Sequence, residues 1–78
     1  MKTHIERRLE QIRDIGEQNN LWLSCDIYYD DLAVNREEQF VVKVHSKITH
    51  INEHFRSNHI RKSLRMAVKW LKEYEAGR

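Results

Sequence analysis

Cations near the carboxyl end of the chain recur at a spacing that puts them on one side of a helix. Together with a neighbouring histidine they form what we call the basic ridge: His59, Arg61, Lys62, Arg65, Lys69 and Lys72. Arginine and lysine side chains bind carboxylates and phosphates. Arg61 and Lys62 would stand in the first helical turn, where the dipole is positive and cations are unfavourable unless an anion covers that end. The ridge is therefore predicted to bind an anionic partner, with a solvated helix face as the alternative.

A second set of candidate contact residues alternates along two predicted strands, 21–29 and 39–45. If helices cover the side that carries Leu23 and Val42, the opposite side carries another five residues: Trp22, Tyr28, Val41, Lys43 and His45. Exposed aromatic and aliphatic side chains of this kind usually mark contacts. We expect a protein interface there, including a symmetric dimer built back to back on the sheet. Stacking on nucleic-acid bases and packing of Trp22 against its own domain are the alternatives.

The histidines and carboxylates do not form a pattern typical of a metal site. His50 and His54 are four residues apart, but the paired close spacings of Cys and His that characterise structural zinc are lacking. The acidic side chains gather in and beside a predicted loop: Asp26, Asp30, Asp31, Glu37 and Glu38. They are expected to be solvated, or to complement a basic patch on a partner or on a second copy of the chain. No metal and no cofactor are expected.

Cys25 is the single cysteine, and its place in the alternation puts it on the buried side of its strand. A thiol there is expected to be inert packing. No nucleophile with a base and an orienting group can be assembled from the sequence, and a chain of 78 residues has little room for a walled pocket. We therefore expect that the protein is not an enzyme.

A helix is predicted at the beginning of the chain to hold the first strand in place. Thr3 and Glu6 have the spacing of a capping box, and Gly16 is placed to end the helix. Its apolar stripe consists of Ile5, Leu9, Ile12 and Ile15. The acidic stretch from Asp30 to Glu38 holds neither Gly nor Pro, so a tight hairpin turn is not expected between the two strands. A mobile loop, or strands extended to a turn at Asn35, would connect them.

A second helix carries the basic ridge. Ser57 or Asn58 is predicted to cap it, and Gly77 to end it. Its apolar stripe consists of Ile60, Leu64, Ala67, Val68 and Leu71. Residues 46–57 are left open between a helical turn, a third strand and an ordered loop, since periodicity cannot decide over so few residues.

These elements predict a single α+β domain over residues 1–78. The expected fold is a small two-layer α-β-β-α sandwich, or α-β-β-β-α with the third strand, in which two helices cover one face of an antiparallel sheet. No apolar run approaches the roughly 18–20 residues of a membrane span, and the single cysteine indicates a reducing cytoplasm. The charge is two-sided: residues 1–39 carry a net −4 and residues 40–78 a net +6.

The order of elements and the start of the second helix together resemble a double-stranded-RNA-binding domain. Arg61-Lys62-Ser63-Leu64-Arg65 is similar in charge to the Lys-Lys-x-Ala-Lys run whose cations touch phosphates in that family. The resemblance implies that the basic helix contacts phosphates. The loop between the first strands differs, because it is acidic here and lacks the family's Gly-Pro-His segment.

The charge layout favours a protein partner over nucleic acid. An acidic lobe and a basic lobe together steer docking onto a protein, whereas nucleic acid would attract only the basic one. We expect a non-enzymatic accessory or regulatory module that docks on a protein or nucleoprotein with an acidic surface. Small domains of this kind include phage and mobile-element inhibitors. A nucleic-acid-binding domain of the double-stranded-RNA-binding type is the alternative, and a homodimer is compatible with either reading.

Overall fold

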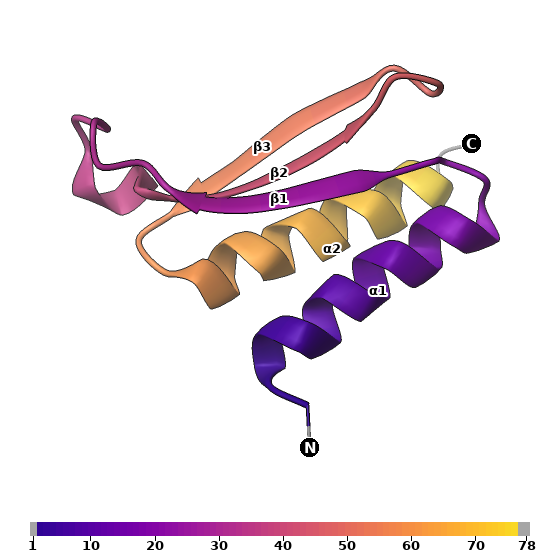
Figure 1. Cartoon of the computed structure of the whole chain (residues 1–78), viewed down its shortest axis with the longest axis horizontal. Helices are drawn as coiled ribbons and strands as arrows, with labels where there is room; N and C mark the ends of the chain where they lie inside the picture. Colours follow the sequence, from indigo (N-terminus) through magenta and orange to yellow (C-terminus); the bar gives the residue numbers. More distant parts are fainter. Residues whose placement is uncertain (1, 77–78) are drawn as a thin grey trace.

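The chain folds in the order α-β-β-β-α, so that residues 46–57 contain a third strand. The computed structural model describes residues 2–76, with side chains described as far as Tyr74. Its elements are α1 (His4–Gln18), β1 (Ser24–Tyr29), the 3-10 turn η1 (Arg36–Glu38), β2 (Phe40–Ser46), β3 (Ile51–Ser57) and α2 (Ile60–Ala76). Both helices lie on one face of the sheet (Figure 1). The predicted two-layer α+β sandwich is confirmed.

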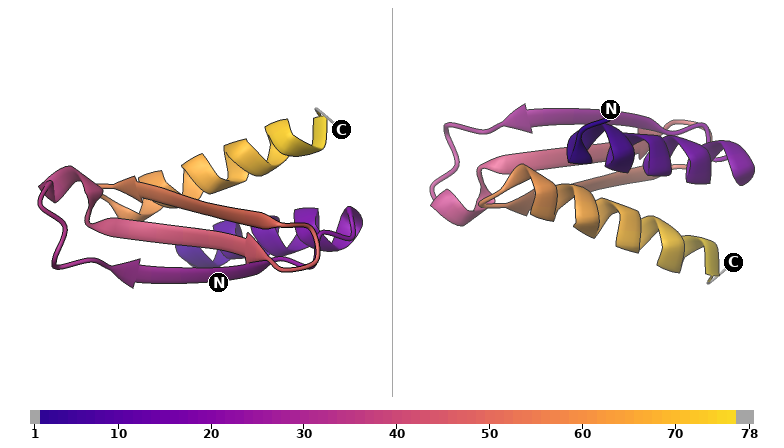
Figure 2. Two further views of the ribbon diagram at one scale, coloured as in Figure 1. Left: turned by 90° about the horizontal axis from the view of Figure 1, so that it is seen from above. Right: turned by 90° about the horizontal axis from the view of Figure 1, so that it is seen from below.

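The strands form one antiparallel sheet in the order β1-β2-β3. Its register pairs Ile27 with Val42 and Val42 with Phe55, so these side chains share one row on the helix side. β2 is the central strand, and β1 and β3 are the two edges. In Figure 2, β1 forms one border of the molecule and α2 the other, with α1 between them.

The core lies between the helix layer and the sheet. α2 packs on β2 and β3, and α1 packs along α2. The buried core consists of Ile12, Leu21, Val42, Val44, Ile51, Phe55, Leu64, Ala67, Val68 and Leu71. Trp70 extends it, because its ring stacks on Tyr74 at 5.2 Å and lies 6.0 Å from the ring of Phe55. Burying each Leu, Val, Ile or Phe side chain contributes about 1.5–3 kcal/mol, so these contacts hold the two layers together.

α1 begins at the predicted cap. The Oγ1 atom of Thr3 accepts a hydrogen bond from the backbone N–H of Glu6 at 3.1 Å. This bond satisfies one of the backbone donors that have no partner within the helix. The cap fixes where the helix starts, and therefore which turn carries His4 and Arg8.

The predicted end of α1 at Gly16 is wrong, because the helix continues to Gln18 and Gly16 is buried inside it. The turn is made by Asn20, whose φ is 53°, while the N–H of Leu21 donates to the carbonyl of Gly16 at 2.9 Å. This is the left-handed helix cap that Asn can supply in place of Gly. Gly16 serves close packing instead: a Cβ there would lie 3.1 Å from Cδ1 of Leu23.

Two serines tie the start of α2 to the sheet. The hydroxyl of Ser63 donates to the carbonyl of Phe40 at 2.7 Å and lies 2.7 Å from the hydroxyl of Ser57. Ser63 is completely buried, so both contacts form away from water, where hydrogen bonds are most costly to lose. The first turn of α2 is therefore held against the junction of β2 and β3.

The cap of α2 is supplied by a residue that was not predicted for that role. Ser57 and Asn58 were the expected caps, but Nδ1 of His59 accepts the hydrogen bond from the N–H of Arg61 at 3.2 Å. Ser57 does not cap α2 because its hydroxyl lies 2.7 Å from the hydroxyl of Ser63 and donates to the carbonyl of His59 at 2.6 Å. Gly77, the expected end of this helix, lies outside the described residues.

Residues 30–39 connect β1 to β2 without a tight hairpin. β1 ends at Tyr29, so the extended-strand alternative is not realised. Within this loop, Asn35 Oδ1 accepts the N–H of Glu37 at 2.9 Å and starts η1. Asp30 forms an ion pair with Arg56 of β3 at 3.1 Å. These bonds fold the acidic loop back toward β3 and the start of α2.

Candidate anion-binding surface

A basic hollow lies between the first two turns of the two helices. It has a volume of about 250 Å³ and is lined by His4 and Arg8 from α1 and by Arg61 and Arg65 from α2. Each pair is four residues apart, so its members lie one above the other on their helix. The hollow therefore brings cations from the two ends of the sequence to one place.

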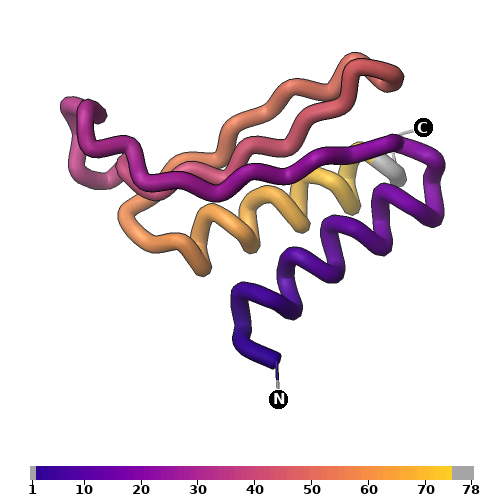
Figure 3. Tube along the Cα trace, viewed as in Figure 1, coloured from indigo at the N-terminus to yellow at the C-terminus, as the bar shows by residue number. Residues whose placement is uncertain are grey.

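The helices run in the same direction (Figure 3). Because His4 and Arg61 line the hollow from the first turn of each helix, the positive ends of both dipoles adjoin it. Each helix N-terminus is equivalent to roughly half a positive charge, and an anion beside it is stabilised by about 0.3–1 kcal/mol. Cations placed there repel the dipole and one another. The arrangement is unfavourable alone, and an anion placed in the hollow would relieve this repulsion.

The five cations of the basic ridge are exposed, and none of them belongs to an ion pair within residues 2–74. They are Arg61, Lys62, Arg65, Lys69 and Lys72. Within residues 2–74, four ion pairs hold other cations: Lys2–Glu10, Arg13–Asp14, His45–Asp26 and Arg56–Asp30. Arg8 donates to the Oε1 atom of Gln11 at 2.9 Å, which steadies its guanidinium without neutralising it.

His59 differs from the other members of the basic ridge. Its Nδ1 accepts the N–H of Arg61 and must be unprotonated to do so. The imidazole thus occupies one backbone donor that an incoming anion would otherwise use. His59 orients the first turn of α2 while the arginines face outward.

Two residues of the hollow were missed by sequence reasoning. His4 and Arg8 belong to the half of the chain whose net charge is −4, and this average hides their position. Their spacing of four residues on one helix face was the available signal. It gains meaning only when α1 is known to lie parallel to α2, which local periodicity cannot reveal.

The predicted aromatic contact face of the sheet does not form. Trp22 precedes β1, has a φ of 55° and lines a hollow together with Leu23 and Cys25, so it does not continue the outer row that carries Tyr28. Val41 does lie on the outer face, but it is completely buried, because β2 is central and its register partners are Tyr28 and Arg56. The expected exposure of Val41 is therefore wrong.

The outer face of the sheet is instead mainly polar. Lys43 and His45 are half-buried there, and His45 Nε2 lies 3.1 Å from Asp26 Oδ2. The exposed residues around them are Ser24, Asp26, Asn52 and His54. Tyr28 retains 40% of its surface as the principal aromatic contribution on this side. A hydrophobic back-to-back interface has little to bury on such a surface.

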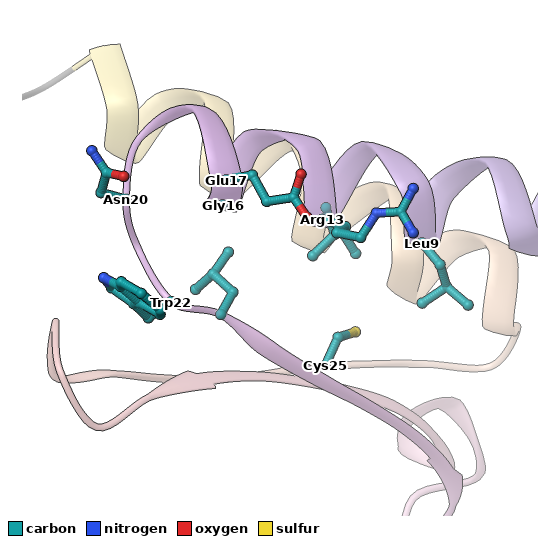
Figure 4. A pocket seen from close by; sticks show the side chains of 9 residues that line it. Leu9, Arg13, Gly16, Glu17, Asn20, Trp22 and Cys25 are labelled. Atoms are coloured by element: carbon teal, nitrogen blue, oxygen red, sulfur yellow. The ribbon is translucent and has the colours of Figure 1, made fainter.

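Trp22 lies beside a second, more apolar hollow between α1 and β1 (Figure 4). This hollow has a volume of about 520 Å³, and its lining includes Leu9, Ile12, Leu23 and Cys25. It exists because α1 leans on α2 and covers β1 incompletely. Burial, and to a lesser degree the charge of Asp26, raise the pKa of the Cys25 thiol, so it stays protonated and weakly nucleophilic near neutral pH.

The acidic loop lies at the same end of the molecule as the basic hollow. Phe40 pairs with Ser57, so the loop before β2 adjoins the connection from β3 to α2. Asp31, Glu37 and Glu38 are exposed on it. The loop and the start of α2 lie at the same end of the domain (Figure 1), so this end carries charges of both signs.

Over residues 2–76, no three His, Cys, Asp or Glu side chains lie together as ligands of a shared ion. In the same part of the chain, neither helix has the length and hydrophobicity needed to cross a bilayer. Comparison of the sequence and the structure with protein-family models, curated proteins and solved structures found no match.

Proposed function

We propose that this protein is a non-enzymatic accessory or regulatory module that docks on a protein with an acidic surface through the basic hollow and the ridge that continues from it. One observation carries the proposal. His4, Arg8, Arg61 and Arg65 converge at the positive ends of two helices, and the residues that line the hollow include no carboxylate. Such a cluster is repulsive in isolation and is stabilised by carboxylates or phosphates of a partner.

A protein partner is favoured over nucleic acid by the loop beside the hollow. Asp31, Glu37 and Glu38 would repel a phosphate backbone that ran from the hollow toward the sheet. A protein can present carboxylates to the hollow and cations to the loop at the same time, and such complementary charges speed association and exclude wrong partners.

Binding to double-stranded RNA is the second candidate, because the α-β-β-β-α order with two helices on one face resembles that of double-stranded-RNA-binding domains. The basic start of α2 would then contact phosphates. The two candidates differ in salt dependence and in ligand preference, so one set of titrations separates them.

The test is fluorescence anisotropy with two probes, a labelled polyglutamate peptide and a labelled RNA duplex, titrated between about 50 and 200 mM salt. We expect the peptide to bind. Arg61→Glu with Arg65→Glu should weaken this binding at least about tenfold, equivalent to about 1.4 kcal/mol. Glutamate at position 61, in the first turn of α2, is compatible with the helix dipole, and position 65 is exposed, so the variant should keep its circular dichroism spectrum.

The matched control is Arg13→Glu with Lys47→Glu, which changes the net charge equally at exposed positions away from the hollow. This variant should bind the peptide nearly as well as the unaltered protein. Equal losses in both variants, or no peptide binding at millimolar protein in low salt, would contradict the proposal. Tight, steeply salt-dependent binding of the duplex with no peptide binding would establish the nucleic-acid alternative.

A further inference from the structure

The two edges of the sheet differ in how well they are protected from pairing with another strand. β3 carries charged and polar side chains, and Glu53 stands on the inner face opposite Val44, where it remains exposed. An inward charge of this kind is a common protection of edge strands. β1 carries one charge, Asp26, which points to the outer face and contacts His45. The edge of β1 is the unprotected one.

The backbone groups on the free edge of β1 follow from its register with β2. The N–H of Asp30 donates to the carbonyl of Gln39 at 2.7 Å, so these opposite residues form a hydrogen-bonded pair. Such pairs alternate along an antiparallel ladder. Tyr28 and Asp26 therefore bond to β2, and the backbone N–H and C=O groups of Cys25, Ile27 and Tyr29 point away from the sheet.

We propose that this edge pairs with β1 of a second copy of the chain, antiparallel and centred on Ile27, to give a continuous six-stranded sheet. A two-fold axis through Ile27 sets Ile27 opposite its equivalent and Cys25 opposite Tyr29 of the second copy. All three residues with free backbone groups then meet their counterparts. If the two-fold axis passed through Cys25 or Tyr29 instead, the two strands would overlap only near one end, and the remaining backbone groups would have no partner. This inference is independent of the proposed function.

The charges and apolar surfaces agree with that register. It sets Asp26 opposite Tyr28 of the second copy, whereas a dimer centred on Asp26 would place two carboxylates directly opposite one another. On the inner face, Ile27 is 38% exposed and Tyr29 is 54% exposed in the single chain. The second copy's tyrosine would lie beside Cys25, at the mouth of the apolar hollow between α1 and β1. Pairing therefore covers surface that the single chain leaves in water.

Disulfide trapping tests the register. Opposite residues in a hydrogen-bonded pair have Cα atoms about 5.5 Å apart, within the roughly 4.4–6.8 Å that a disulfide spans. Ile27→Cys, made with Cys25→Ser to leave one thiol, should form a cross-linked dimer under mild oxidation. Ser24→Cys in the same background is the matched control, since its two copies would be six residue steps, about 20 Å, apart. His54→Cys tests the opposite edge of the sheet.

We expect Ile27→Cys to cross-link many times faster than the two control variants. Sedimentation equilibrium of the unaltered protein should show a mass that rises with concentration toward twice 9.5 kDa. A constant mass of 9.5 kDa up to millimolar concentration would overturn the inference. Cross-linking of the three variants at one rate, or faster at His54→Cys, would also overturn it, because the dimer would then not use the edge of β1.

Discussion

At the scale of single residues, short-range bonds decide what the charged groups can do. His59 was grouped with the cations of the basic ridge from its position next to Arg61. In the structure its imidazole accepts a backbone hydrogen bond and acts as the cap of α2. The sequence could not distinguish these roles, because Ser57 and Asn58 are better cap formers and stand just before it. Ser57 is unavailable because its hydroxyl belongs to the buried network with Ser63.

The capping role of His59 predicts a stability difference between two substitutions. His59→Ala removes the acceptor and should lower the free energy of unfolding by about 1 kcal/mol. His59→Asn keeps a side-chain acceptor and should recover most of that loss. Urea denaturation followed by circular dichroism measures both. Equal stability of the alanine variant and the unaltered protein would contradict the role of this residue as a cap.

At the scale of elements, strand alternation and helix stripes were sufficient to predict most of the architecture. The alternation along 21–29 correctly set Leu23 and Cys25 on the helix side, but it failed at Trp22, which has a positive φ and lines a hollow together with these two residues. β3 could not be identified because Asn52, Glu53 and His54 interrupt its apolar pattern, as suits an edge strand. The burial of Val41 depends on neighbours from both adjacent strands, which a single strand's pattern does not contain.

The start of α1 provides a pH-dependent test at this scale. The carboxylate of Glu10 accepts a hydrogen bond from the ammonium group of Lys2. This bond, and to a lesser degree the positive charges of Lys2 and Arg13, lower the pKa of Glu10 below its ordinary value of 4.5. A carboxyl whose pKa is lower in the folded state stabilises the fold above its unfolded pKa, and this contribution is lost as the pH falls through the folded pKa. Lys2→Ala should therefore raise the pKa of Glu10 toward 4.5.

Carbon-detected NMR titration of the Glu10 carboxyl measures this shift directly. The neighbouring residue, Gln11, has no titrating carboxyl. The Glu6 carboxyl, on the same helix, serves as the reference whose titration Lys2→Ala should leave unchanged. A pKa of Glu10 that is unchanged by Lys2→Ala would show that the contact between Lys2 and Glu10 does not persist in solution.

At the scale of the whole molecule, the parallel course of α1 and α2 turns two modest local patterns into one surface. Neither His4 with Arg8 nor Arg61 with Arg65 is unusual by itself. Packed side by side, they form a cationic hollow between two helix N-termini. The basic ridge could be predicted from spacing, but the hollow could not, since it depends on a tertiary contact between the two ends of the chain. The acidic loop beside it gives this end of the domain its mixed charge.

The most direct test of this account is a map of where an acidic ligand binds. In a titration of the ¹⁵N-labelled protein with polyglutamate peptide, backbone amide resonances report the contact residue by residue. We predict that the largest shifts fall at residues 4–8 and 61–65, the two segments that line the hollow. Shifts confined to β1 and the apolar hollow beside it, or an unchanged spectrum at saturating peptide, would contradict the account.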